Sequence, residues 1–346
     1  MNKSTDLCSD LLPNDEGFTR MKQDLFERID ADELAPSINL VTPVTPIHTR
    51  AKKTMRRRWA GAMAVAAAAI TVALLGANLF SPNVATATAA EVLRSAAAAT
   101  IITADPVVGP GQYLMIQRTE GALSRGNDSG YIYNSRSAMY IPYDRSDTWV
   151  EELQWLPDGE IFGDAAEAQA EIDDSWSTPG HGDVKFYEGP AGIFAGSDRS
   201  YPEMASMPTD PTELLDFVYN NLTGGNPPDE QAFVDICDHL STGVVPAELR
   251  AAMYEALARI PGVYVAEGEA TVDGRTGVAI GRKTNSDSES HQLIIDPATG
   301  LLIGTRSVQL IDRQFVPAGT RGNVTLETTV VDQAPTGPFT VRPPQG

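Results

Sequence analysis

The longest apolar stretch of the chain covers residues 59–80 and contains no charged residue. As a helix with a rise of about 1.5 Å per residue, this stretch spans about 33 Å, which is enough for the hydrocarbon core of a bilayer. Trp59 and Phe80 stand at its two ends, where aromatic side chains favour the membrane interface. The pattern predicts one transmembrane helix, with the lipid bilayer as its partner.

Basic residues gather on one side of this stretch. Arg56, Arg57 and Arg58 come directly before it, whereas no Lys or Arg follows it until Arg94. An excess of Lys and Arg marks the cytoplasmic flank of a membrane helix. We therefore expect a single-pass protein of the plasma membrane, with residues 1–58 as a cytoplasmic arm and linker and the C-terminus on the extracytoplasmic side.

A cleaved signal peptide is the alternative interpretation of the same stretch. Residues 85–89 read Ala-Thr-Ala-Thr-Ala and offer the small-residue pattern of a cleavage site. However, the region before the apolar stretch is far longer than the n-region of a signal peptide, and the stretch itself is longer than a typical h-region. We expect the helix to be retained as an anchor.

Beyond the apolar stretch the pattern is first helical and then strand-like. Residues 81–110 form a spacer of small residues and a membrane-proximal helix from Ala89 to Ile102. From residue 111, short apolar and aromatic runs bounded by Gly, Pro and Asp predict strands. The strands expected in this first group cover 112–119, 130–133, 138–141 and 148–155, and the second and third of them form a hairpin.

The C-terminal part predicts helices followed by more strands. Residues 160–208 are rich in Gly and acidic residues, so we expect an irregular surface excursion there. Helices are expected in 209–260 and an antiparallel meander in 263–331. The order predicts an α+β domain at 111–335, built as a curved antiparallel sheet with helices on one face. Residues 336–346 form a C-terminal tail.

Charge divides the chain in a similar way. Ten of the 26 basic and nine of the 46 acidic residues lie in residues 1–58, which leaves a net charge of −21 for the remainder of the chain. A field of this sign repels nucleic acid, so we expect no nucleic-acid partner.

Signatures of catalysis and of cofactor binding are missing from the sequence. The histidines His48, His181, His239 and His291 are far apart, and no H-E-x-x-H, C-x-x-C, P-loop or G-x-S-x-G motif occurs. We expect no metal, no cofactor and no enzymatic activity. An extracytoplasmic hydrolase stays open as an alternative, because a pair of catalytic carboxylates is assembled from distant residues.

Aromatic residues are dense in the first group of strands. On the concave side of a curved sheet they would line a groove for an apolar ligand. In the other interpretation they are ordinary strand and core residues, because aromatic side chains favour strands. The candidate groove residues are Tyr113, Tyr131, Tyr133, Tyr140, Trp149 and Trp155.

Several short motifs follow one another along the chain. They are Arg56–Arg58 before an Ala-rich span, Ala89–Leu93, Gly111–Leu114, Met207–Pro211, Val245–Arg250, Ile260–Val263 and Asp296–Gly300. In this order they resemble a group of actinobacterial single-pass membrane proteins whose genes often lie beside sigma-factor genes. The group has no established catalytic residues that could be carried over to this chain.

A looser resemblance concerns the outer domain. Asp296–Gly300, between two apolar strands, is similar to a turn in the half-barrel fold shared by lipoprotein carriers and anti-sigma-factor regulators. The two resemblances imply a membrane-anchored sensor or binding protein whose cytoplasmic arm contacts a sigma factor, although the arm lacks the His/Cys cluster of zinc-binding anti-sigma domains. A tethered carrier of lipid or another apolar ligand is the first alternative, and the hydrolase is the second.

Overall fold

The computed structural model describes residues 85–341, apart from residues 104, 127 and 194–200. The predicted cytoplasmic arm and the predicted transmembrane helix lie outside the described residues. Within the described part of the chain, no helix is both long enough and apolar enough to cross a membrane.

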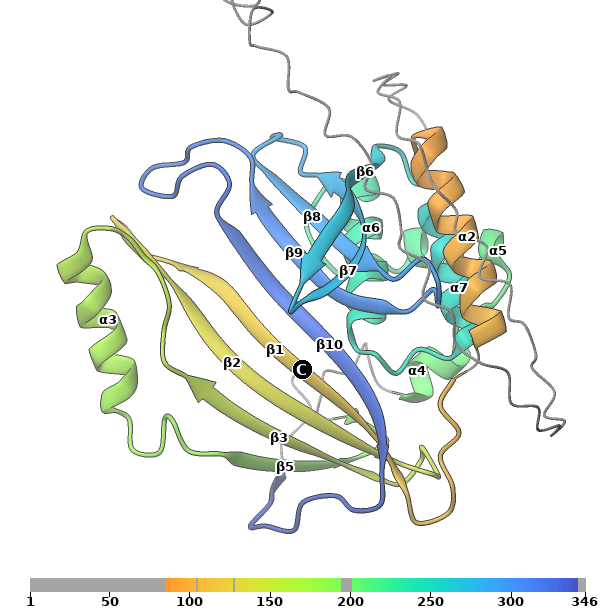
Figure 1. Cartoon of the computed structure of the whole chain (residues 1–346), viewed down its shortest axis with the longest axis horizontal. Helices are drawn as coiled ribbons and strands as arrows, with labels where there is room; N and C mark the ends of the chain where they lie inside the picture. The colour runs from red at the N-terminus through yellow and green to blue at the C-terminus, as the bar shows by residue number, and fades with distance from the viewer. Residues whose placement is uncertain (1–84, 104, 127, 194–200, 342–346) are drawn as a thin grey trace, which may run out of the picture. The chain divides into compact units, whose positions relative to one another are not determined.

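One large sheet forms the frame of the domain (Figure 1). Its strands follow the order β11-β5-β3-β2-β1-β10-β9-β8-β7-β6, and β4 pairs with β2 outside this path. Neighbouring strands are antiparallel, except that β11 is parallel to β5. The strands are β1 Tyr113–Arg125, β2 Ser129–Pro142, β3 Thr148–Leu156, β4 Ile161–Gly163, β5 Lys185–Pro190, β6 Val263–Val272, β7 Arg275–Lys283, β8 Glu289–Ile295, β9 Leu302–Gln309, β10 Arg321–Val331 and β11 Thr340–Val341.

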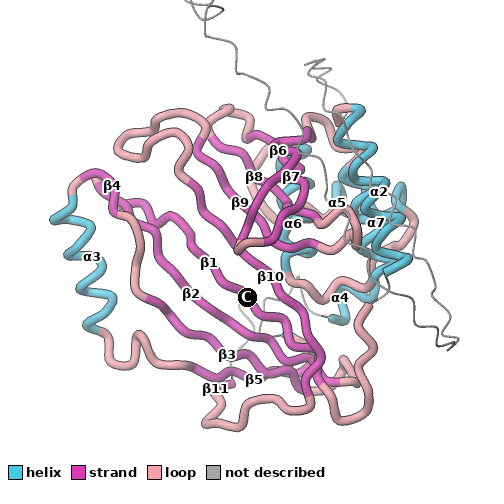
Figure 2. The backbone as a smooth tube through the Cα atoms, viewed as in Figure 1, coloured by secondary structure: helices cyan, strands magenta, loops and turns pink. Residues whose placement is uncertain are grey.

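The helices gather at two places beside this sheet (Figure 2). Helices α2, α5, α6 and α7 lie together beside the half of the sheet that holds β6 to β9, whereas α3 lies at the opposite end and contacts β2 and β4. The described helices are α2 Ala87–Thr103, α3 Ala165–Ser177, α4 Tyr201–Ser206, α5 Pro211–Asn220, α6 Pro228–Ser241 and α7 Ala247–Leu257.

Local sequence sets the start of two of these helices. The Asp210 carboxylate accepts hydrogen bonds from the backbone N–H groups of Thr212 and Glu213, and Pro211 occupies the first helical position of α5. Both features favour a helix start, because the first N–H groups of a helix lack partners within the helix. Asp164 caps the first turn of α3 in the same manner.

The main core lies between the helices and one face of the sheet. The register places Leu114 opposite Ile141 and Ile116 opposite Met139. Alternate residues of a strand point to the same face, so these apolar side chains all face the helices. Buried helix residues that belong to the same core include Leu93, Phe233, Ile236, Met253 and Leu257.

Helix α2, the predicted membrane-proximal helix, belongs to this core. It packs against α7, and Leu93 on its inner side is completely buried. The Tyr254 hydroxyl on α7 donates a buried hydrogen bond of 2.9 Å to the carbonyl oxygen of Gly300, in the turn between β8 and β9. These contacts fix α2 and α7 against the C-terminal strands.

The α+β class and the antiparallel meander from β6 to β10 are confirmed. Two local predictions are wrong. Residues 130–133 and 138–141 belong to one strand, β2, because the polar residues between them pair with β1 on one side and β3 on the other. Residues 160–208 hold β4, α3, β5 and α4, since the Gly-rich and acidic composition hides a capped helix and short strands.

Candidate ligand-binding site

Strands β9 and β10 diverge partway along their length (Figure 1). Their ladder ends at the pair Gly304–Thr325. Beyond this pair, β9 remains bonded to β8 as far as Leu302, and β10 remains bonded to β1 as far as Val331. The sheet therefore forks into one branch with β6 to β9 and another with β10 and the N-terminal strands.

Arg275 bridges the two branches of this fork. Its Nη1 donates a hydrogen bond of 2.6 Å to the carbonyl oxygen of Leu326 on β10, and its Nη2 donates one of 3.1 Å to that of Ile303 on β9. A carbonyl group withdrawn from water without a partner costs about 1–3 kcal/mol. The guanidinium thus supplies donors where the ladder between β9 and β10 no longer does.

A cavity of about 240 Å³ lies at the fork, and it also touches the segment between α6 and α7. Apolar side chains make up most of its lining, as is usual for sites that bind small molecules. The apolar lining residues are Pro106, Leu114, Leu240, Val244, Val245, Leu301, Leu302, Ile303 and Leu326. The charged lining residues are Asp105, Arg145, Arg250, Arg275 and Glu327.

Arg250 is held by partners within the protein. Its Nη2 lies 2.8 Å from a carboxylate oxygen of Asp105, its Nη1 donates to the carbonyl oxygen of Val245 at 2.7 Å, and its Nε donates to Thr100 Oγ1. Asp105 also accepts a hydrogen bond of 2.9 Å from the backbone N–H of Ala247, at the start of α7. This ion pair therefore joins α7 to the segment that follows α2.

Arg145 reaches the cavity from the turn between β2 and β3. Its Nη1 donates a hydrogen bond of 3.2 Å to the carbonyl oxygen of Val244, and its guanidinium carbon lies 5.8 Å from the centre of the Tyr201 ring. Its backbone carbonyl accepts a hydrogen bond of 2.8 Å from Trp149 Nε1. Among the described residues, no carboxylate forms an ion pair with Arg145 or Arg275.

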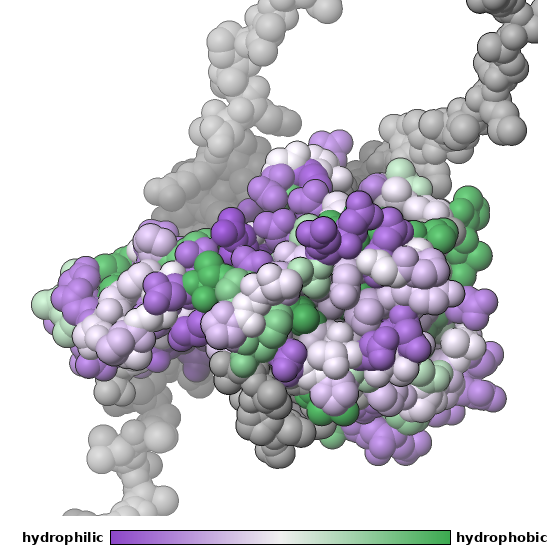
Figure 3. All heavy atoms as spheres, turned by 90° about the horizontal axis from the view of Figure 1, so that it is seen from below, coloured by the Kyte–Doolittle hydropathy of each residue, from purple (hydrophilic) through white to green (hydrophobic). Residues whose placement is uncertain are grey.

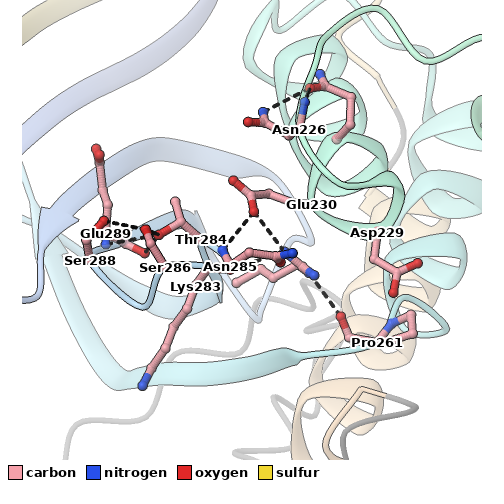
Figure 4. Close-up of polar contacts among 12 residues, drawn as sticks. Asn226, Asp229, Glu230, Pro261, Lys283, Thr284, Asn285, Ser286, Ser288 and Glu289 are labelled. Carbon is pink, nitrogen blue, oxygen red and sulfur yellow. Dashed lines mark hydrogen bonds and ion pairs between the residues drawn. The ribbon is translucent and has the colours of Figure 1, made fainter. Parts of the chain in front are cut away.

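The start of α6 is fixed by Glu230. Figure 4 shows Glu230 of α6 beside Asn285 of the β7–β8 turn. One Glu230 carboxylate oxygen accepts a hydrogen bond of 2.8 Å from the N–H of Asn285 and lies 3.8 Å from Arg282 Nη1. Arg282 also donates to the carbonyl oxygen of Pro261 at 3.0 Å. The end of the same helix brings Leu240 to the cavity. Helix α6 is thus anchored at its start by Glu230, and its last turn contributes to the cavity wall.

The structure separates the six aromatic residues predicted to line a groove. By strand alternation, Tyr131, Tyr133 and Trp155 share the sheet face that carries the core residues. Tyr113 and Tyr140 point to the opposite face.

Trp149 shares the core face as well, but it is only 1% exposed and belongs to the core. Tyr133 and Trp155 meet edge to face, with ring centres 5.7 Å apart. Burial and the neighbouring Glu120 carboxylate raise the pKa of Tyr133. The fork cavity is lined by other residues than these six.

The sequence analysis missed two aromatic residues that extend this pair. The His181 ring stacks on Trp155 at a centroid distance of 5.9 Å and meets the edge of Trp176 at 4.8 Å. Trp176 Nε1 donates a hydrogen bond of 2.7 Å to Asp158. This cluster attaches the end of α3 to β3. An open depression of about 320 Å³ adjoins it and is lined by Pro157, Asp158, Gly159, Ile161, Gln169, Ile172 and Trp176.

The histidines in the described residues lie on separate elements. His181 precedes β5, His239 lies on α6, and His291 lies on β8. Over this part of the chain, no group of three or more His, Cys, Asp or Glu side chains is arranged to hold a metal ion. The cavity lining offers apolar contact, guanidinium N–H donors and the two carboxylates of Asp105 and Glu327.

One face of the molecule is mostly hydrophilic. Figure 3 shows a face on which hydrophilic residues predominate and apolar residues form separate small patches. Two strongly exposed apolar side chains flank the cavity-lining pair Asp105–Pro106 in sequence, since Ile102 is 84% exposed and Val107 is 89% exposed.

The cavity arginines were not predicted as a group. Arg250 appeared only within a family motif, and Arg145 and Arg275 were not among the predicted binding residues. One signal was available for Arg275: Asp273 and Gly274 form a tight turn with φ of 49° and 73°, which fixes the point where β7 begins.

Comparisons with known proteins give a distant likeness. No protein-family model and no curated protein matches the chain. A putative outer membrane lipoprotein-sorting protein domain from Vibrio parahaemolyticus is 9% identical, with 70% of this chain and 92% of that chain covered and a TM-score of 0.18. A DUF1329 family protein from Desulfovibrio piger (9% identity) and a LolA superfamily protein from Nitrosomonas europaea (6% identity) cover the same shares, each with a TM-score of 0.16. These values support no statement about a ligand of this chain.

Proposed function

We propose that the described domain binds an apolar molecule in the fork cavity and acts as a binding or carrier domain. The observation that carries this proposal is the fork itself. Two sheet branches separate beside the helical layer, and half of the residues that line the cavity at this point are Leu, Ile or Val. Contact with such walls stabilises a bound chain by about 25 cal/mol for each Å² of apolar surface removed from water.

The size of the cavity limits what enters it. Its volume of about 240 Å³ lies just below the usual range for small-molecule sites, which begins at about 300 Å³. The cavity therefore suits one short chain, or the end of a longer chain whose remainder lies outside. Val107 directly follows the lining residue Pro106 in sequence, and its exposed side chain offers apolar contact for such a remainder.

The proposal also includes a location. If residues 59–80 anchor the chain as their composition predicts, the domain binds its ligand at the extracytoplasmic surface of the membrane. The sensor function stays a prediction about the outer domain at 111–335, and the sigma-factor contact stays a prediction about residues 1–58.

A fluorescence binding assay with a cavity-filling variant tests the proposal. The full chain is inserted in nanodiscs and titrated with the neutral fluorophore N-phenyl-1-naphthylamine, and the signal of empty discs is subtracted. Leu302→Phe fills the cavity, and Leu156→Phe alters a half-buried leucine on β3, away from it. We expect saturable binding that weakens by about tenfold in Leu302→Phe only, in line with a loss of about 1.4 kcal/mol. Absence of saturable binding to the unaltered chain contradicts the proposal.

A further inference from the structure

We infer that the ligand of the fork cavity carries an anionic group, which Arg145 and Arg275 bind. The inference rests on the proposed function and adds the chemical class of the ligand, an amphiphile with an apolar chain and a carboxylate or phosphate head. The three cavity arginines, Arg145, Arg250 and Arg275, differ in whether a carboxylate balances their charge.

The charge of Arg250 is already balanced. Asp105 lies 2.8 Å away, and the Arg250 side chain is only 8% exposed. Its remaining donors are taken by Thr100 and Val245. Arg250 therefore stabilises the fold, since removing it would leave the Asp105 charge without its cationic partner.

The charge of Arg275 is not balanced by a carboxylate among the described residues. Its two hydrogen-bond partners are the neutral carbonyl oxygens of Leu326 and Ile303. A guanidinium has five N–H donors in a fixed fork, and two of them make these bonds. The group is half-buried beside apolar walls, where an unpaired charge is more costly than in water and attracts an anion more strongly.

Arg145, on the helical side of the cavity, likewise forms no ion pair with a carboxylate among the described residues. Its neutral partners are the Val244 carbonyl oxygen and the Tyr201 ring. The adjacent Asp144 carboxylate accepts hydrogen bonds from the N–H and the hydroxyl of Ser146, at 3.0 Å and 2.6 Å. That carboxylate is therefore engaged within the turn.

The charge of the cavity lining differs from the charge of the chain around it. Beyond residue 58 the chain has a net charge of −21, so its overall field repels anions. Nevertheless the cavity lining holds three guanidinium groups, of Arg145, Arg250 and Arg275, against the two carboxylates of Asp105 and Glu327. Among the described residues, Arg145 and Arg275 form no ion pair with a carboxylate. Guanidinium groups suit carboxylate and phosphate oxygens, because their N–H donors match the geometry of these groups. Apolar walls beside such donors fit a ligand with one apolar end and one anionic end.

Ligands with the same apolar chain and different head groups show how much the head group contributes to binding. The full chain in nanodiscs is titrated with decanoate, decyl phosphate and decanol, with empty discs subtracted. We expect both anions to bind about tenfold more tightly than decanol, which corresponds to one charge-assisted hydrogen bond. The ratio of decanoate to decyl phosphate then identifies which head group fits better.

Arginine variants assign the preference to the cavity. Arg275→Gln and Arg145→Gln should each reduce the preference for anions over decanol, whereas the exposed Arg313→Gln should keep it. Arg275→Lys retains the charge without the fork of donors and should keep part of the preference, which guards against loss of fold in Arg275→Gln. Equal binding of decanol and both anions to the unaltered chain overturns the inference but leaves the proposed function standing. If none of the three ligands binds, the proposed function itself fails.

Discussion

The Nη1 atom of Arg275 lies 2.6 Å from the carbonyl oxygen of Leu326, although 51 positions separate the two residues in the sequence. The bond runs from β7 to β10 across the fork between β9 and β10, at a point where β10 has already left its ladder with β9. It gives one residue two tasks. Arg275 stabilises the diverging branches, and it presents a positive charge to the cavity between them.

Replacing Arg275 by Gln should lower stability. The substitution removes donors from two carbonyl groups, so we expect the free energy of unfolding to fall by about 1–3 kcal/mol. Chemical denaturation of the full chain in the presence of a mild detergent measures the change. Arg313→Gln, at an exposed position, should stay within about 0.5 kcal/mol of the unaltered chain. Equal changes in the two variants would show that the bridge contributes nothing specific.

The ion pair between Arg250 and Asp105 should behave as a coupled unit. Arg250→Met removes the cation beside the Asp105 carboxylate, which keeps its hydrogen bond from Ala247. Because the Asp105 side chain is 30% exposed, we expect a loss of about 2–3 kcal/mol, below the range of about 3–5 kcal/mol for a fully buried pair. Asp105→Asn should also destabilise the domain. The double variant should lose less than the sum of the single losses, which a double-mutant cycle by denaturation measures. Simple additivity would contradict a direct interaction.

Gly243 should not tolerate a side chain. Its φ is +74°, and an added Cβ would lie 2.9 Å from Cγ2 of Ile116 in the core. Gly111, at φ +84°, has open space around it and serves as the matched control for backbone strain alone. We expect Gly111→Ala to cost about 1–2 kcal/mol from the left-handed backbone conformation. Gly243→Ala should cost at least about 1 kcal/mol more. Thermal unfolding of the two variants decides, and similar costs would mean that the Ile116 contact relaxes freely.

Tyr254 should link stability to alkaline pH. Burial raises the pKa of its phenol above the ordinary value of 10.0, so the folded state keeps the proton after the unfolded state begins to lose it. The resulting stability is complete below about pH 10 and falls as pH rises above that value. Tyr254→Phe removes the hydrogen bond to Gly300 and should cost about 1 kcal/mol at neutral pH. It should also make the alkaline decline shallower, which unfolding curves at several pH values test. An unchanged decline would assign it to other groups.

The sequence allowed the fold class to be predicted, because the relevant signals are local. Strand alternation and the Asp296–Gly300 turn define the C-terminal meander without reference to distant residues. The prediction for residues 160–208 was wrong because the local signals there are weak. The Gly and acidic residues of this region resemble a loop, and only the Asp164 cap, followed by Glu167 in the first turn, marks the start of α3.

The fork cavity could not be predicted from the sequence. The cavity joins Asp105, Arg145, Leu240, Leu302 and Leu326, which come from five separate segments. Nothing local indicates that β9 and β10 diverge, and without that divergence Arg275 reads as an ordinary strand residue.

The aromatic prediction had a related limit. The two-residue spacing of Tyr131 and Tyr133 places both side chains on one face of a strand, yet it does not show which face the helices cover. The core position of Trp149 follows from the packing of distant helices rather than from its own strand.

Photolabelling tests the central claim most directly, namely that an apolar chain occupies the fork cavity. The full chain in nanodiscs is irradiated with decanoate that carries a diazirine at its apolar end, with and without excess unlabelled decanoate, and the labelled peptides are mapped by mass spectrometry. The account predicts labels that the competitor suppresses, in residues 240–245, 301–303 and 326–328. Competed labels around Tyr131, Tyr133 and Trp155 instead, with none at the fork, would contradict the claim and return the aromatic face as the binding site.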